Sequence, residues 1–235
     1  MNIDNLGIKI FADGADPVKA VQQSALSYIN GFTTNPTLMR QAGIIDYRTW
    51  AEIMLECVNG KPISFEVLAD EFPEMERQAR TIASWGKNIY VKIPITNTKG
   101  QPSDPLIKRL SCDGVQVNVT AVMVARNIPF LAGLLSREIP SIVSIFAGRI
   151  ADTGIDPAQI VALARNSLPP NVEVLWASTR EIFNIKQAID ANCDIITVPD
   201  NLLAKLNLLG KDLKEFSRET VQQFYDDAIA SQYIL

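Results

Sequence analysis

The sequence contains no histidine and only three cysteines among its 235 residues. The absence of histidine excludes Ser-His-Asp and Cys-His mechanisms, histidine general bases and histidine metal ligands. The cysteines, Cys57, Cys112 and Cys193, are widely spaced and odd in number, which predicts neither a disulfide framework nor a Cys-x-x-Cys metal site. In an enzyme of this composition, lysine, carboxylates, hydroxyl groups and water must carry the proton transfers.

The chain also lacks basic runs and long apolar segments. Its net charge is −4 and its isoelectric point is about 5.0, so nothing suggests a nucleic-acid partner. No apolar stretch is long enough to span a membrane, and the N-terminal segment lacks the basic and apolar parts of a secretory signal. We therefore expect a cytoplasmic protein that binds neither nucleic acid nor membrane.

Short apolar segments recur at intervals of roughly 20 to 30 residues, the spacing typical of βα units. They predict eight strands, at 8–13, 31–35, 62–68, 88–95, 115–122, 142–148, 172–178 and 193–199. Helical periodicity fills the segments between them, as at 51–58, 72–85 and 156–166, where Asp156 before Pro157 is typical of a helix start.

This alternation predicts an α/β fold, a single (β/α)8 barrel domain that spans residues 1–235. A doubly wound open sheet is the alternative fold. Such a sheet usually carries a glycine-rich phosphate loop after its first strand, and the segment Asp13-Gly14 is not one. The barrel is therefore favoured.

Two further helical stretches, at 201–208 and about 213–231, follow the eighth strand. The second carries an apolar stripe that includes Phe216, Val221 and Phe224, and it is followed by the apolar residues Tyr233, Ile234 and Leu235. A terminal helix with such a stripe needs a surface to cover. We interpret that surface as part of another subunit.

Lys92 interrupts an apolar, largely β-branched segment at 90–95 (YVKIPI). Lysine is seldom fully buried, because removing an ammonium group from water is costly. One interpretation is a lysine at a strand end whose amine reaches solvent or pairs with a carboxylate. The other is a buried amine that attacks a carbonyl group. The absence of histidine favours the second.

Polar residues lie at the carboxyl ends of seven consecutive predicted strands, where barrel enzymes place their catalytic groups. These residues are Asp13, Asn35, Glu66, Lys92, Asn118, Thr120, Ser144, Arg149, Ser178 and Arg180. Each taken singly has a structural explanation, as a cap, a turn, a strand former or a surface group. Together they point to one barrel end, where two arginines suit a phosphate and a lysine with carboxylates suits Schiff-base chemistry.

At these residues the sequence resembles the transaldolases, in particular the short transaldolase and fructose-6-phosphate aldolase group of class I aldolases. The matching motifs occur in order on successive predicted strands and span nearly the whole chain. They are GFTTNPTL at 31–38, VKIP at 91–94, NVT at 118–120, SIFAGRIAD at 144–152 and ASTR at 177–180. The fold of that family is a (β/α)8 barrel, which agrees with the count of strands.

The resemblance implies that Lys92 forms a Schiff base with a ketose phosphate and that Asp13 is the acid/base during carbon–carbon cleavage. Glu66 and Thr120 would hold a water that carries protons to and from the enamine. The resemblance implies no cofactor and no metal. It assigns substrate binding to six residues: the dihydroxyacetone carbons to Asn35, Asn118, Ser144 and Ser178, and the phosphate to Arg149 and Arg180.

Two positions favour a transaldolase over a fructose-6-phosphate aldolase. The aldolases carry glutamine on the third strand and tyrosine on the sixth, where this chain has Glu66 and Phe146. The alternatives are an aldolase that releases free dihydroxyacetone, or a relative that acts on an unusual sugar. Gly14 and the long polar loop at 96–104 depart from the family pattern and leave the acceptor sugar open.

A third hypothesis is a non-catalytic barrel that binds sugar phosphate. The joint presence of Lys92, Asp13 and Glu66 speaks against it, because a binder needs only the arginines. The resemblance further implies a transferase of the pentose phosphate pathway. It also implies a ring-shaped homo-oligomer, commonly a decamer, in which the C-terminal helix crosses between subunits.

Overall fold

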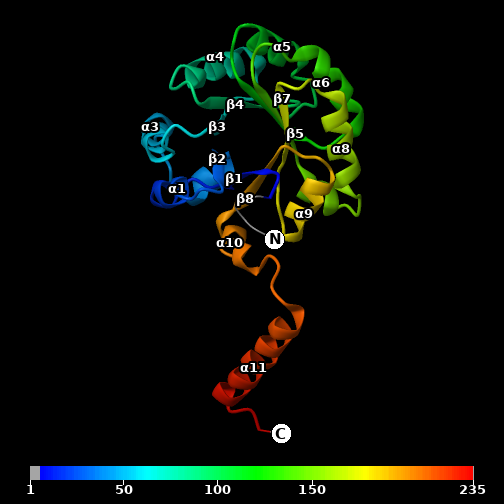
Figure 1. Cartoon of the computed structure of the whole chain (residues 1–235). Helices are drawn as coiled ribbons and strands as arrows, with labels where there is room; N and C mark the ends of the chain where they lie inside the picture. Colours follow the sequence, from blue (N-terminus) through cyan, green and yellow to red (C-terminus); the bar gives the residue numbers. More distant parts are fainter. Residues whose placement is uncertain (1–5, 235) are drawn as a thin grey trace.

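The computed structural model describes residues 6–234 and shows eight parallel strands closed into one barrel (Figure 1). The strands are β1 (Lys9–Asp13), β2 (Ile29–Thr33), β3 (Ile63–Glu66), β4 (Ile89–Pro94), β5 (Val117–Val122), β6 (Ser141–Ile145), β7 (Val172–Trp176) and β8 (Ile195–Pro199). Each strand pairs with the next along the chain, and β8 pairs with β1. The closed barrel confirms the predicted fold and excludes the open sheet.

Helices alternate with the strands and, apart from the last one, lie around the barrel (Figure 1). They are α1 (Pro17–Ser24), α2 (Pro36–Gln41), α3 (Tyr47–Cys57), α4 (Phe72–Ala83), α5 (Asp104–Cys112), the short η2 (Ala125–Asn127), α6 (Ile128–Leu134), α7 (Ala147–Ala151), α8 (Pro157–Ser167), α9 (Phe183–Asp190), α10 (Asp200–Leu203), the short η3 (Leu206–Leu208) and α11 (Leu213–Ser231). The predicted start of α8 is confirmed, since Asp156 Oδ1 accepts a hydrogen bond from Ala158 N.

Most predicted elements differ from the observed ones by one or two residues at an end, and three differences have a clear local cause or change the element itself. The strand predicted at 31–35 ends at Thr33, because Asn35 caps α2 and Pro36 occupies its first turn. The strand predicted at 142–148 ends at Ile145, because the next residues turn into α7. The stretch predicted as one helix at 201–208 is two short ones, α10 and η3.

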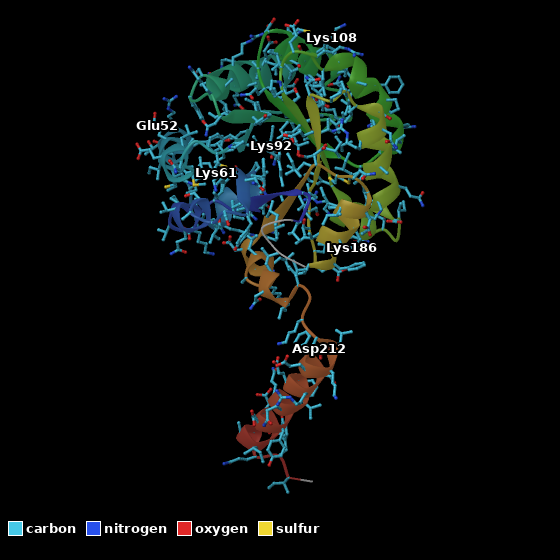
Figure 2. All side chains as sticks on the ribbon, viewed as in Figure 1. Glu52, Lys61, Lys92, Lys108, Lys186 and Asp212 are labelled. Carbon is cyan, nitrogen blue, oxygen red and sulfur yellow. The ribbon has the colours of Figure 1, made fainter. Side chains whose placement is uncertain are left out.

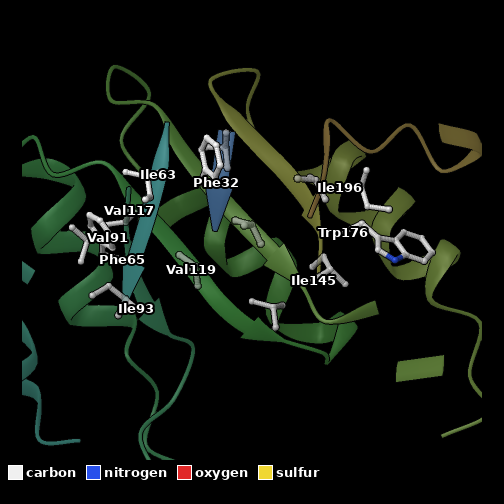
Figure 3. Packing of buried hydrophobic residues seen from close by; sticks show 14 of the residues in the cluster. Phe32, Ile63, Phe65, Val91, Ile93, Val117, Val119, Ile145, Trp176 and Ile196 are labelled. Atoms are coloured by element: carbon white, nitrogen blue, oxygen red, sulfur yellow. The ribbon is translucent and has the colours of Figure 1, made fainter. Parts of the chain in front are cut away.

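The core lies mainly between the outer face of the barrel and the helices (Figure 3). Phe65 of β3, for example, packs edge-on against Tyr47, Trp50 and Trp85. A smaller cluster around Phe11 lies inside the barrel. A Cβ at Gly31 would stand 2.5 Å from the Phe11 ring, so glycine makes room for it. Phe11 precedes Asp13 by two residues and therefore shares its face, one layer lower.

Helix α11 stands away from the barrel (Figure 1), and none of its residues is buried. Its apolar side chains are largely exposed: Val221, Phe224, Tyr225 and Ile229 are each between 62% and 66% exposed. The presence of a C-terminal helix is thus confirmed, and its contact with another subunit stays a prediction. Within residues 6–234, no helix has both the length and the apolar character needed to cross a membrane.

Candidate active site

Lys92 lies inside the barrel (Figure 2), and its side chain is only 7% exposed. Its Nζ lies 2.9 Å from Glu66 Oε2 and donates a hydrogen bond to the carbonyl oxygen of Thr34 at 2.8 Å. The register of β3 and β4 sets Glu66 directly beside Lys92. The amine is therefore both buried and paired with a carboxylate, which can accept its proton before it attacks a carbonyl group.

Asp13 ends β1 next to Thr33 on β2, and Thr33 Oγ1 donates a hydrogen bond to Asp13 Oδ1 at 2.8 Å. Burial raises the pKa of Asp13 above its ordinary value; the Lys92 ammonium and the Thr33 bond oppose this rise, while Asp200 and Glu66 add to it. A carboxyl group with a raised pKa can both accept and return a proton, as acid/base catalysis requires.

A buried chain of polar side chains crosses the barrel below the mouth, the end formed by the carboxyl ends of the strands. Ser144 Oγ donates to Asn118 Oδ1 at 2.7 Å, and Asn118 Nδ2 donates to Ser64 Oγ at 3.0 Å. Sequence reasoning identified the first two but missed Ser64. The available signal was its place two residues before Glu66, on the same face of β3.

Thr120 is buried on β5, and its Oγ1 has no hydrogen-bond partner within the described part of the chain. Buried hydroxyl groups are usually hydrogen-bonded, so the Thr120 hydroxyl is available to bind a water or a substrate group. The next residue, Ala121, has the left-handed φ of 59°, and the pairing with β6 shifts register here. Strained backbone of this kind is concentrated at functional sites.

Arg149 and Arg180 lie beyond the ends of β6 and β7, and both are exposed. The Arg149 guanidinium lies over the Phe146 ring at 5.3 Å and makes no ion pair with any residue between 6 and 234. Arg180 pairs with Asp152 at 2.7 Å in an exposed ion pair. Both guanidinium groups are thus accessible to an anion at the mouth.

Gly148 allows the segments that carry these two arginines to pack closely. A Cβ at Gly148 would lie 1.7 Å from the carbonyl oxygen of Ser178 and 3.0 Å from Arg180 Cγ. Ser178 itself has a left-handed φ of 64°. The segment that carries Arg149 therefore packs directly on the turn that carries Ser178 and Arg180.

Asn35 has a structural role, because its Oδ1 accepts a hydrogen bond from Leu38 N at the start of α2.

Of the predicted site residues, the structure brings Asp13, Glu66 and Lys92 together, and it links Asn118 to Ser144. The substrate-binding roles of Asn35, Ser178 and the other candidates stay predictions.

The loop at 96–104 is fixed at the mouth by contacts with the segment that follows β3. Asp70 accepts two hydrogen bonds of 2.7 Å from Thr98, and Lys99 pairs with Glu71. A cavity of about 390 Å³ between these segments reaches Glu66.

Among the residues that the structure describes, no group of three or more cysteines, aspartates and glutamates is placed to hold a metal ion.

The chain matches the model of the Transaldolase/Fructose-6-phosphate aldolase family over residues 10–233. A "Probable transaldolase" of Streptococcus equi subsp. zooepidemicus is 32% identical over 221 residues, which cover 90% of this chain and 97% of that protein. A "Probable transaldolase" of Lactiplantibacillus plantarum is 33% identical over 219 residues, which cover 90% and 96%.

A solved structure of a cube-shaped protein cage, designed by fusing symmetric oligomeric domains, has a TM-score of 0.56 at 12% identity and covers 97% of this chain and 80% of that chain. At this identity the likeness shows the fold alone. The family match and the two relatives confirm the resemblance that the motifs indicated. The chain belongs to the Transaldolase/Fructose-6-phosphate aldolase family and is an enzyme of the aldolase or transaldolase type.

Proposed function

We propose that the protein is a transaldolase of the pentose phosphate pathway, which moves a dihydroxyacetone unit from fructose 6-phosphate or sedoheptulose 7-phosphate to an aldose phosphate. The observation that carries the proposal is the buried pair of Lys92 and Glu66, 2.9 Å apart, in a barrel whose mouth also holds Asp13 and two accessible arginines. The names of the relatives support the same reaction class.

In the first half-reaction, the Lys92 amine gives a proton to Glu66 and attacks C2 of the ketose. Loss of water then leaves a protonated imine, which is an electron sink. Asp13 takes the proton of the C4 hydroxyl, the bond between C3 and C4 breaks, and its electron pair moves into an enamine. The first aldose phosphate leaves, and the three-carbon unit stays bound to Lys92.

In the second half-reaction, the enamine attacks the aldehyde carbon of the acceptor, and Asp13 returns its proton to the new hydroxyl group. Water then hydrolyses the imine and releases the product ketose. We assign another water, one that carries protons to and from the enamine, to the space beside Glu66 and Thr120, whose hydroxyl has no partner within residues 6–234. Asn35, Asn118, Ser144 and Ser178 hold the hydroxyl groups of the three-carbon unit. The steps need no cofactor.

The test of this function compares wild-type enzyme on fructose 6-phosphate with and without erythrose 4-phosphate. A transaldolase should release little free dihydroxyacetone alone and should consume the ketose at least about tenfold faster with the acceptor. Glu66→Gln should shift the balance toward free dihydroxyacetone, since an amide can orient the water but cannot accept its proton. Equal consumption with and without acceptor would contradict the transaldolase and favour the aldolase.

Replacing either Arg149 or Arg180 with alanine is expected to lower kcat/KM for phosphorylated substrates by roughly 10- to 200-fold, because each variant loses charged hydrogen bonds to phosphate. The loss should be much smaller with glyceraldehyde as acceptor. Arg77→Ala is the matched control, since Arg77 is an exposed arginine in an ion pair on α4. Equal losses with both acceptors would show that the arginines are structural.

We also propose that α11 packs on a neighbouring subunit of a ring-shaped homo-oligomer, with a decamer as the expected size. Its exposed apolar residues support this contact. A chain that ends at Gly210 should give smaller species by light scattering. Phe224→Glu should act in the same direction, and Gln222→Glu, which adds the same charge two residues earlier, should act less. An unchanged mass for the truncated chain would refute the crossing helix.

A further inference from the structure

Two buried threonines meet beside Asp13, and sequence reasoning assigned neither of them a role. Strand β1 lies between β2 and β8 in the barrel. The register places Thr33 of β2 beside Asp13, and it places Thr197 of β8 beside Phe11, two residues earlier on β1. Both threonines are buried, with 4% and 5% of their surface exposed. Their hydroxyl groups are hydrogen-bonded to each other.

The direction of these hydrogen bonds follows from the number of protons. Thr33 Oγ1 donates its only proton to Asp13 Oδ1 at 2.8 Å. In the bond between the two hydroxyl groups, Thr197 must therefore be the donor and Thr33 the acceptor. The series of hydrogen bonds thus runs from Thr197 through Thr33 to Asp13. Thr179 Oγ1 also donates to the carbonyl oxygen of Thr197 at 2.6 Å, which holds this part of β8 in place.

We propose that Thr33 and Thr197 are positioning residues that fix the Asp13 carboxylate and keep it ready to accept a proton. The inference rests on the proposed role of Asp13 as the acid/base. Oδ1 is held by Thr33, whereas Oδ2 accepts no hydrogen bond from any residue in the described range. These hydrogen bonds thus leave Oδ2 of Asp13 to take the proton of the C4 hydroxyl of the ketose.

The surroundings of Asp13 explain why such support is needed. Two further carboxylates face it, Glu66 from β3 and Asp200 from α10, and both oppose its ionisation together with burial. Asp200 is itself paired with Lys19 of α1 at 2.7 Å. Lys92 of β4 and the Thr33 hydroxyl are the groups that favour the ionised form of Asp13 and lower its pKa. Of these two, only the hydroxyl bonds to the carboxylate directly.

The test measures the pH dependence of single-turnover cleavage of fructose 6-phosphate. Thr33→Val loses the donor, so the pKa of Asp13 rises and the acid limb should move to higher pH by about one unit. The cleavage rate should then fall about tenfold at pH values below the acid limb and change little at pH values above it. Thr197→Val should move the limb in the same direction by less, and Thr33→Ser should restore it. Ser111→Ala removes a buried hydroxyl on α5 and is the control.

Borohydride trapping at Lys92, measured over the same pH range, separates this inference from the proposed function. Trapping should keep its wild-type pH dependence in Thr33→Val. If trapping occurs but the acid limbs of Thr33→Val and Thr197→Val coincide with wild type, the hydroxyl groups only fill space and the inference is wrong. If wild-type enzyme shows no trapping at Lys92, the proposed function fails and the inference falls with it. Thr197→Val keeps the test decisive if Thr33→Val does not fold.

Discussion

Replacing Lys92 with arginine is expected to lower the turnover of fructose 6-phosphate by about 10⁴-fold or more, to near the rate without enzyme. Arginine keeps the positive charge and can still pair with Glu66, which lies 2.9 Å from the Lys92 amine. Its guanidinium group remains protonated and cannot form an imine. The rate of aldose phosphate formation, followed at high enzyme concentration, measures the loss.

Lys87→Arg is the matched control, because Lys87 is an exposed lysine shortly before β4. Its activity should stay within about twofold of wild type, as expected for a surface substitution. Circular dichroism should show that both variants are folded. More than about a tenth of wild-type turnover in Lys92→Arg would rule out an imine at this residue.

Replacing Gly148 with alanine is expected to damage the phosphate end of the site. The added Cβ would lie 1.7 Å from the Ser178 carbonyl oxygen, so the backbone near Arg149 or Arg180 must move. Overpacking of this kind costs about 1–3 kcal/mol of stability, and a misplacement of 1 Å can cost about 10²-fold in rate. We expect a lower melting temperature and a kcat/KM for phosphorylated substrates reduced by about 10²-fold.

Gly133→Ala is the control for this substitution. Gly133 lies in α6, and a Cβ there would meet nothing within 4 Å. Alanine is a better helix former than glycine, so this variant should be stabilised by about 0.4–1 kcal/mol with unchanged activity. A wild-type melting temperature and activity in Gly148→Ala would contradict the close approach of the two segments.

The fold could be predicted because the strands of a closed parallel barrel are short apolar segments at regular intervals. Two of the errors lie where the chain turns into a helix almost directly after a strand. The predicted strand at 31–35 includes Thr34 and Asn35, but Asn35 caps the start of α2 with its side chain. Ala147 and Gly148 follow the apolar segment of β6 closely and are therefore included in the predicted strand, but they form the first turn of α7.

The charged part of the site could be predicted because a lysine or carboxylate in an apolar strand is conspicuous. Ser64, Thr33 and Thr197 could not be predicted as site residues. Small hydroxyl residues are common in strands, and the sequence does not show which group each hydroxyl contacts. Their contacts also join distant segments: Asn118 and Ser64 are 54 residues apart, and Thr33 and Thr197 are 164 apart. Only closure of the barrel brings such pairs together.

The most direct test of the central claim is reduction of the enzyme with borohydride in the presence of fructose 6-phosphate, followed by peptide mapping by mass spectrometry. An imine between enzyme and ketose becomes a stable amine when it is reduced. The proposed mechanism predicts one modified residue, Lys92, that carries the three-carbon dihydroxyacetone unit or the whole ketose. Modification at Lys87 or Lys99 instead, or no adduct at all while turnover continues, would contradict it.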